Sequence, residues 1–465
     1  MRPRTMFAAV ALACSLPALA ADDVALLRAE LSRLSERIAA LENHNRELEK
    51  ALESERISEK EPELATRLKA VENQAQAAQK QAHHSEALEG VSVGASLTAV
   101  AQKANAASSL AAGEDRSRTG YRGDITVTLP GGEMGDIEGK IFTHLRFGQG
   151  TGLGLRPTYT STLNTTAFQI GKVADDSFAI LAQAWYQLAV PLPRDGVKAQ
   201  AKQRLLFTVG KIDPFVFFDQ NAAADDESSK FLNNAFVHNP LLDSGGDIGA
   251  DQYGFAPGAI VRYENEQEKS ETWGLSLGVF GTGPGANFTG SPGKPFVIAQ
   301  ADTTWRFNFL PGNYRAYVWS NGRGQGYDGL ERRHAGWGMS LDQKVADDLT
   351  LFGRYGHETT GKVRFDRALV AGAELGGADW GRAADSLGLA LGGLRTSADF
   401  RQDAPVDAAV AYAAQGWEKQ AEIYYRYRVN SRLELSPHLQ WIANPAGDGA
   451  APAIKVAGLR AKVGF

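Results

Sequence analysis

The sequence predicts an all-β chain, a transmembrane antiparallel β-barrel of about sixteen strands, preceded by an N-terminal α-helical coiled coil. Three observations lead to this fold class. Apolar and polar residues alternate with period two from about residue 91 to the C-terminus, as in strands with one apolar face. Before residue 60 the apolar residues recur in steps of three and four, as in a coiled coil. The first twenty residues read as an export signal.

The composition excludes several classes of protein. The 465 residues carry 49 Lys and Arg against 54 Asp and Glu, which is not basic enough for a nucleic-acid-binding protein. One cysteine excludes a disulfide scaffold, and the eight histidines show no metal-ligand spacing, so no metal site and no cofactor are expected. The mean hydropathy is −0.28. Length alone favours two or three soluble domains, whereas 50 glycines and 9% aromatic residues favour an all-β chain.

Residues 1–20 are expected to be a signal peptide. Two arginines give a positively charged start, residues 6–16 form a short apolar core, and Ala18-Leu19-Ala20 is a small-residue cleavage site. The core is too short for a membrane anchor. A lipoprotein signal would use Cys14, but the residues before it fit that motif poorly. Cleavage would remove the only cysteine, which suits an oxidising periplasm.

Residues 21–88 are expected to form a periplasmic coiled coil and linker. Four heptads carry Leu, Ile or one Asn at positions a and d, and a buried Asn there fixes the register. These positions are Leu27, Leu31, Leu34, Ile38, Leu41, Asn45, Leu48 and Leu52. The spacing favours self-association through residues 27–52 and is compatible with a homotrimer, without distinguishing two, three or four helices. The alternative is a lone amphipathic helix packed on the rest of the protein.

Residues 89–465 are expected to form the barrel. Their alternating segments suit a half-buried sheet in water or a barrel in lipid. Three features favour the barrel: strands of about nine to twelve residues, aromatic residues at strand ends, and charges on one face of strand after strand. The strand-end aromatic residues are Phe147, Tyr263, Trp305 and Trp441.

The predicted strands number sixteen, an even count as in bacterial single-chain barrels, although fourteen or eighteen would also fit. A weak segment at Thr166–Ile170 is not counted. The strands are expected to begin near Val91, Arg122, Asp136, Phe178, Lys202, Pro257, Glu271, Phe296, Asn313, Ala335, Leu349, Arg367, Ser386, Lys419, Arg432 and Ile454.

One stretch is more specific than the alternation. It begins with Gly210-Lys211-Ile212-Asp213-Pro214 and continues with Phe218-Asp219-Gln220-Asn221, Asp225-Asp226-Glu227 and Phe236-Val237-His238-Asn239-Pro240. This stretch resembles the carbohydrate-selective porins of the OprB type, in which a strand ends in Gly-Lys-x-Asp and enters a long Phe-Asp-x-Asn loop. The resemblance covers roughly residues 120–465. It implies a sixteen-stranded outer-membrane barrel that passes sugars by diffusion.

Both ends of the chain add expectations about partners. The last strand ends in Phe465, which resembles the signal read by the outer-membrane barrel assembly machinery, unless it is an ordinary last strand. The coiled coil is not part of the OprB pattern. Sucrose-type porins of the maltoporin class carry one, so the addition is compatible with a sugar channel and with a trimer. A contact between the coiled coil and peptidoglycan is a further expectation.

Strand parity identifies candidate pore-lining residues. Charged groups would bind sugar hydroxyls and aromatic rings would contact the sugar ring. The candidates are Arg122, Arg146, Trp185, Arg204, Arg262, Arg306, Arg315, Tyr317, Trp319, Glu422, Arg426 and Arg428. In the alternative interpretation, these charges mainly solvate the pore and pair with one another.

The loop from Asp213 to Asp251 is far longer than a tight turn, and loops of this length are usually functional or disordered. Its phenylalanine-rich start is expected to anchor it inside the barrel and narrow the lumen. The constriction would then contain Asp219, Asn221, Asp225, Asp226 and Glu227. The alternative is an extracellular loop that never enters the pore.

The leading functional hypothesis is a passive outer-membrane porin for mono- and oligosaccharides. A general or anion-preferring porin on the same fold is the second hypothesis, and an envelope tether held by the coiled coil is the third. An enzyme is not expected. Gly274-Leu275-Ser276-Leu277-Gly278 matches the hydrolase nucleophile motif, but it lies in the middle of a predicted strand.

Overall fold

The computed structural model describes residues 90–465, except 106–116, 154–162, 169–175, 193–200, 243–252, 269, 283–292, 408–409 and 411. Of the residues before 90 it describes only residue 43. The predicted signal peptide and coiled coil therefore lie outside the described residues, apart from that one position, and the predicted domain boundaries stay predictions. No helix in the described part of the chain is long and apolar enough to cross a membrane.

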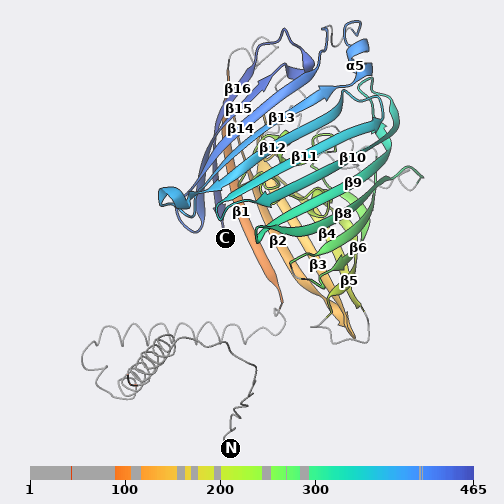
Figure 1. Ribbon diagram of the computed structural model, residues 1–465, viewed down its shortest axis with the longest axis vertical. Helices are drawn as coiled ribbons and strands as arrows, with labels where there is room; N and C mark the ends of the chain where they lie inside the picture. The colour runs from red at the N-terminus through yellow and green to blue at the C-terminus, as the bar shows by residue number, and fades with distance from the viewer. Residues whose placement is uncertain are drawn as a thin grey trace, which may run out of the picture. The chain divides into compact units, whose positions relative to one another are not determined.

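Sixteen antiparallel strands form a closed barrel, in which each strand pairs with its neighbours in sequence and the first pairs with the last (Figure 1). The predicted count of sixteen is confirmed. The strands are β1 (Ser92–Ala104), β2 (Ser117–Met134), β3 (Ile137–Gln149), β4 (Phe178–Leu192), β5 (Gln203–Ile212), β6 (Ala256–Asn265), β7 (Trp273–Phe280), β8 (Phe296–Phe307), β9 (Leu310–Gln325), β10 (Glu331–Lys344), β11 (Leu349–Thr360), β12 (Phe365–Gly376), β13 (Ser386–Thr396), β14 (Trp417–Arg428), β15 (Leu433–Ala443) and β16 (Ile454–Gly464).

Some strands are longer than the sequence predicts. β2 has 18 residues and β9 has 16. In β2, a register shift between Pro130 and Glu133 lets the pairing with β3 continue beyond the regular ladder. For β9, a register shift between Arg332 and His334 of its partner β10 has the same effect. The described part of the weak segment, residues 166–168, forms no strand, as expected.

The alternation of the sequence becomes an alternation between the outer and inner faces of the barrel. In β7, Leu275 and Leu277 are exposed on the outer face, while Gly274, Ser276 and Gly278 are buried inside. An isolated protein would not leave so many large apolar side chains in water, whereas a membrane covers them. The barrel therefore has the surface of a membrane protein.

Exposed aromatic residues lie near both ends of the strands. Trp273, Trp305 and Phe307 lie near one end of the barrel, and Trp441 lies toward the other. Aromatic side chains prefer the boundary between lipid and water because their rings are apolar and their edges are polar. Trp305 and Trp441 are two of the four predicted strand-end aromatic residues, whereas the other two, Phe147 and Tyr263, are only partly exposed.

The connections at the two ends of the barrel differ in length. At one end, Gly135-Asp136 joins β2 to β3 and Asn308-Phe309 joins β8 to β9. Both Asn308 and Phe309 have positive φ, as a two-residue hairpin turn requires. At the other end, residues 213–255 connect β5 to β6. We call residues 213–242 of this connection the inner loop, because they pack against the inner faces of the strands.

The main apolar core of the barrel lies inside it. Phe215, Phe218, Leu241 and Leu242 of the inner loop are buried in one cluster with inward-facing residues of β4 to β9, β12 and β13. A second cluster joins Phe231 and other inner-loop residues to β11 to β14. The inner loop thus fills much of the lumen. The points at which the loop is attached to the barrel wall determine which part of the lumen stays open.

Candidate functional site

The inner loop turns into the barrel through two short capped helices. η4 (Pro214–Val216) begins after Asp213, whose carboxylate accepts the backbone N–H two residues further on at 3.0 Å. Proline suits the first position of a helix because that position needs no N–H donor. α4 (Asn234–Val237) begins after Asn233, whose side chain makes the same kind of bond at 3.0 Å.

The first attachment of the inner loop is Asp219, which has a left-handed backbone with φ of 56°. Its carboxylate accepts hydrogen bonds from the Tyr317 hydroxyl at 2.8 Å, from Arg354 Nε at 3.2 Å and from the Asn239 N–H at 2.6 Å. Arg354 also donates to the carbonyl oxygens of Asp219 at 3.1 Å and of Phe236 at 2.9 Å. This group fixes the loop to β9 and β11.

Glycines on the wall let the loop approach closely at this attachment. The side chain of Asn239 donates to the Tyr317 hydroxyl at 2.7 Å and lies beside Gly338 of β10 and Gly356 of β11. A Cβ atom on Gly356 would lie 2.5 Å from the Asn239 side-chain oxygen. Any larger residue at this position would therefore displace the loop.

The second attachment lies on β14. The Glu422 carboxylate accepts the backbone N–H groups of Leu232 and Asn233, each at 2.9 Å. The Asn233 side chain also donates to Gln420 at 2.8 Å. Phe231 packs edge-on against Tyr424, with ring centroids 5.0 Å apart. Because these polar groups are buried, their mutual hydrogen bonds hold the loop firmly.

The third attachment lies on β16. Arg460 donates to the backbone oxygens of Glu227 at 3.0 Å and of Lys230 at 2.6 Å. Lys462 donates to the hydroxyls of Ser228 at 2.6 Å and Ser229 at 2.8 Å. The loop is thus fixed to β9, β11, β14 and β16. Among the strands that the structure describes, β2 and β3 face the space that the inner loop leaves open.

A cavity of about 420 Å³ lies between the inner loop and the inner faces of β2 and β3. Arg122 and Arg146 line its strand side, and Asp213, Asp225 and Glu227 line its loop side. Volumes of a few hundred Å³ are typical of small-molecule sites. Opposite charges thus face each other across a space of small-molecule size.

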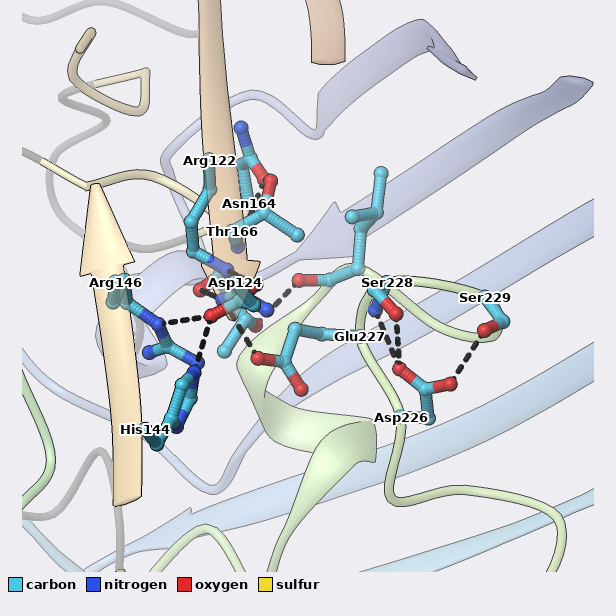
Figure 2. Close-up of polar contacts among 12 residues, drawn as sticks. Arg122, Asp124, His144, Arg146, Asn164, Thr166, Asp226, Glu227, Ser228 and Ser229 are labelled. Carbon is cyan, nitrogen blue, oxygen red and sulfur yellow. Dashed lines mark hydrogen bonds and ion pairs between the residues drawn. The ribbon is translucent and has the colours of Figure 1, made fainter. Parts of the chain in front are cut away.

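Figure 2 shows how the charges on the two sides meet. Arg122 donates to Asp124 at 2.9 Å and reaches across to Glu227 at 2.8 Å. Asp124 also accepts hydrogen bonds from Arg146 and His144, each at 2.7 Å. Both arginines are therefore held in fixed orientations by carboxylates. A fixed guanidinium offers its remaining N–H groups to a solute without first having to be ordered.

The carboxylates on the loop side differ in their electrostatic surroundings. Burial alone opposes ionisation of Glu227, but the charges of Arg122 and Arg146 outweigh it and hold the pKa of this carboxyl below its usual range. Burial raises the pKa of Asp213 and of Asp225 above the usual range, because backbone hydrogen bonds and more distant charges offset it only in part.

Aromatic rings complete the cavity, and the sequence alone did not identify them. Phe215 and His238 stack with centroids 3.8 Å apart and planes 5° from parallel. Phe168 and Tyr253 stack at 5.5 Å. All four line the cavity. They lie in connections rather than strands, where no periodicity marks which side chains face inward. The only sequence signal was the phenylalanine-rich start of the loop.

Four of the predicted site residues lie together at the cavity: Arg122, Arg146, Asp225 and Glu227. Three other predicted loop residues fasten the loop instead. Asp219 binds Arg354, as described above, and Asn221 donates to the Leu341 carbonyl at 2.9 Å. Asp226 lies 3.7 Å from Lys462 and accepts hydrogen bonds from Ser228.

The three predicted aromatic contacts face inward but lie within the core that the loop covers. Trp185, Tyr317 and Trp319 are 7%, 3% and 3% exposed and pack with Phe215 and Phe218. They do not line the cavity beside β2 and β3. A direct contact between these rings and sugar stays a prediction.

The remaining predicted lumenal residues mostly pair with other lumenal charges. Arg306 is exposed near the end of β8, and Glu422 holds the loop. The pairs are Arg204–Glu266, Arg262–Asp302, Arg315–Asp342, Arg426–Glu374 and Arg428–Glu434, with N–O distances from 2.5 to 3.6 Å. This is the mutual pairing that the alternative interpretation describes. No cluster of potential metal ligands occurs among the residues that the structure describes.

Comparison with known proteins identifies a family and solved structures that this chain resembles. The profile of the family described as "Carbohydrate-selective porin, OprB family" matches residues 159–465. The high-pH structure of Pseudomonas putida OprB aligns with a TM-score of 0.65 and 16% identity, over 81% of this chain and 95% of that chain. A mutant of Rh. blastica porin aligns with a TM-score of 0.44 and 10% identity, over 81% and 100%. No curated protein sequence matches the chain.

Proposed function

The chain belongs to the carbohydrate-selective porin family OprB, and on that premise we propose that the cavity beside the inner loop is the constriction through which carbohydrates diffuse. The chain is accordingly an outer-membrane carbohydrate porin. The observation that carries the proposal is the pair formed by Arg122 and Glu227, which joins barrel wall and loop beside aromatic rings.

A sugar presents hydroxyl groups around the edge of a weakly apolar ring. In the constriction, the remaining N–H groups of Arg122 and Arg146 would donate to hydroxyl oxygens, while Glu227 and Asp225 would accept hydrogen bonds from sugar hydroxyls. The rings of Phe215 and Tyr253 offer flat apolar surfaces for the sugar faces. Each contact replaces one that the sugar makes with water, so binding stays weak enough for release.

Passive diffusion also fits how the inner loop is attached. The loop is fastened to β9, β10, β11, β14 and β16 by buried and partly buried hydrogen bonds, so the constriction keeps its shape while solutes pass. A rigid, pre-formed set of donors and acceptors favours one class of solute without an energy source. The family and fold are those of non-enzymatic channels.

The orientation in the membrane follows from the connections. Short turns of bacterial barrels face the periplasm, so the turn at Asn308-Phe309 marks that side and the inner loop enters from the outside. Because the number of antiparallel strands is even, the start of β1 and the end of β16 lie on the same side of the barrel. The N-terminal segment would then leave β1 into the periplasm, which supports a periplasmic coiled coil.

The partner assignments belong to the same proposal. The segment 27–52 would associate copies of the chain, with a trimer as one arrangement, and would lie where it can contact peptidoglycan. Phe465 would be read by the barrel assembly machinery. Its side chain is 75% exposed, and its N–H pairs with β1 at the Ala95 carbonyl. A general or anion-preferring porin, and an envelope tether, remain the alternatives that experiments should separate.

Single-channel conductance of the purified full-length protein in planar bilayers tests the proposal. Added mono- and disaccharides should reduce the current in a saturable way. Arg146→Gln should weaken this block, because it removes a charged donor from the cavity. The matched control is Arg333→Gln, an exposed arginine at the rim of β10. Indifference of the current to every sugar, or equal effects of both variants, would contradict the proposal.

A further inference from the structure

Three cations lie together on the outer face of the barrel, at the end where the inner loop enters. Arg367 lies near the start of β12, Arg395 near the end of β13 and Lys419 near the start of β14, and these strands are neighbours in the wall (Figure 1). The alternation along each strand places them on the face of the exposed apolar residues, such as Leu369 and Leu391. The three cations therefore face the membrane.

The pairing of the strands brings the three cations side by side. Arg367 and Arg395 are direct partners in the ladder between β12 and β13, which places their Cβ atoms about 5 Å apart. Lys419 is the ladder partner of Gly393, so it lies diagonally beside Arg395. Like charges directly opposite each other on a sheet destabilise the pairing. An anion between the arginines would remove this penalty.

No carboxylate in the described part of the chain neutralises these cations. The side chains of Arg367, Arg395 and Lys419 form no ion pair or hydrogen bond with a described residue, and Nε of Arg367 is buried without a hydrogen-bond partner there. Asp366, at the register shift near the start of β12, pairs with neither arginine. A buried donor of a charged group without an acceptor is costly, which favours a ligand that supplies oxygen atoms.

At the opposite end of the same strands, the outer-face cation is neutralised. Arg382, in the turn between β12 and β13, lies 2.5 Å from a carboxylate oxygen of Asp385. Its guanidinium group also lies 4.1 Å from the centroid of the Tyr427 ring. The two ends of this part of the wall therefore differ in that only the end near the inner loop presents cations without a partner from the described residues.

Aromatic residues flank the cations on the same face. Trp417 is the ladder partner of Arg395, and its ring covers Gly393, where an added Cβ atom would lie 3.0 Å from the ring. On the other side, His357 is the ladder partner of Arg367. Tryptophan prefers the level of the lipid headgroups, and cations on the lipid face of a barrel are tolerated there but costly deeper in the membrane. The cations thus lie where lipid phosphates are found.

We propose that Arg367, Arg395 and Lys419 form a binding site for the phosphate groups of a glycolipid in the outer leaflet of the membrane. A phosphate between the two arginines would accept hydrogen bonds from both guanidinium groups and convert their repulsion into a bridge. The acyl chains of the same lipid would lie against exposed leucines such as Leu369 and Leu391. The orientation proposed above places this end of the strands on the outside.

Binding of defined lipids to the purified full-length protein in an uncharged detergent tests this site. Native mass spectrometry measures the affinity for a diphosphorylated lipid A, for the same lipid without its phosphates and for inorganic phosphate, at low ionic strength to limit screening. We expect the phosphorylated lipid to bind about tenfold or more tightly than the other two, because each cation near a membrane surface adds to the attraction. Equal binding of the two lipids overturns the proposal. Inorganic phosphate that binds as tightly as the phosphorylated lipid overturns the assignment to a lipid.

The double variant Arg367→Gln/Arg395→Gln identifies the residues responsible. Its affinity for the phosphorylated lipid should fall about tenfold or more. Its unfolding temperature without lipid should stay the same or rise, because the like-charge pair is gone. Lys419→Gln changes one exposed residue and should lower the affinity about fivefold. The matched control is Arg332→Gln, a cation at the same end of the barrel that Asp328 already neutralises, which should bind the lipid like the wild type.

The variants separate a lipid site from two other roles. A lower unfolding temperature of the double variant with an unchanged affinity for the phosphorylated lipid would mean that the arginines serve only the sheet, and overturns the proposal. A changed oligomer size with an unchanged lipid affinity also overturns it and assigns this face to contacts between copies of the chain. Equal losses of affinity in Lys419→Gln and Arg332→Gln overturn the assignment to these residues. The loss in Lys419→Gln decides the matter even if the double variant does not fold.

Discussion

The carboxylate of Asp219 and the guanidinium of Arg354 form an ion pair, 3.1 Å apart, in which both side chains are completely buried inside the barrel. Asp219 belongs to the inner loop and Arg354 to β11, 135 residues later in the sequence. The pair holds the loop across the lumen. The size of the cavity beside β2 and β3 therefore depends on a contact that lies outside the cavity.

Removing one partner of this pair should release the loop. Asp219→Ala leaves a buried guanidinium without its carboxylate, which typically costs about 3–5 kcal/mol. We expect a lower unfolding temperature in detergent, measured by the loss of β-sheet circular dichroism, and a larger, noisier single-channel conductance. Asp328→Ala, which removes an acid from an exposed pair with Arg332, should leave both measurements near the wild type. An unchanged conductance in Asp219→Ala would show that other attachments suffice.

The attachment on β14 should behave as a second, independent fastening. Glu422→Gln leaves one good acceptor for the N–H groups of Leu232 and Asn233 in place of two. We expect a loss of about 1.5–3 kcal/mol in the free energy of unfolding, as for other hydrogen bonds to a buried charge. Urea titration in folded detergent complexes measures it. Glu434→Gln breaks a more exposed pair with Arg428 and should cost less than 1 kcal/mol; equal costs would contradict the assignment.

Aromatic residues at the cavity and in the covered core should respond differently to truncation. Tyr253→Ala removes a ring that lines the cavity and should weaken sugar block of the current by about twofold to tenfold. Trp319→Ala should lower the unfolding temperature through the cavity that it leaves in the core, with little direct effect on sugar affinity. The opposite pattern would show that sugar contacts Trp319, as strand parity predicted.

The ion selectivity of the channel should change on acidification. Because burial raises the pKa of Asp225 and Asp213, these carboxylates take up protons at a higher pH than ordinary aspartates do. Each loses its negative charge as the pH falls through this raised value, so the ratio of potassium to chloride permeability should fall there. Glu227, whose pKa is lowered, stays ionised. Reversal potentials measured from pH 8 downward test this.

The double variant Asp213→Asn/Asp225→Asn is the control for the pH experiment. It should show a flat reversal potential over the range in which the wild type changes. A pH response that persists in the double variant would assign the effect to other groups near the cavity, which include His144 and His238.

The barrel itself could be predicted from the sequence because its signal is local. In β7 each outward leucine is followed by a small inward residue, and period two is a property of neighbouring residues. All sixteen strands were therefore found. The lengths of β2 and β9 were underestimated, because a register shift depends on the partner strand, which the segment itself does not encode.

The candidate site could be predicted only in part. The alternation of residues along each strand correctly predicts which side chains face inward. These include Arg122, Arg146, Tyr317 and Trp319. It could not show that the first two border the open cavity while the last two lie within the core covered by the inner loop. That distinction depends on which wall the loop packs against. Phe215 was missed as a lining residue for the same reason.

The sequence by itself determined the barrel fold, the face of each strand that meets lipid and the loop that carries the acidic residues. These follow from periodicity and from short motifs, which need no knowledge of distant contacts. Only the tertiary structure decided where the inner loop leaves a cavity open. The contact between Arg122 and Glu227 joins residues 105 positions apart, and it forms because Arg354, Glu422 and Arg460 fasten the loop elsewhere. Such long-range contacts are set by the closure of the barrel, which brings β16 beside β1 and encloses the loop.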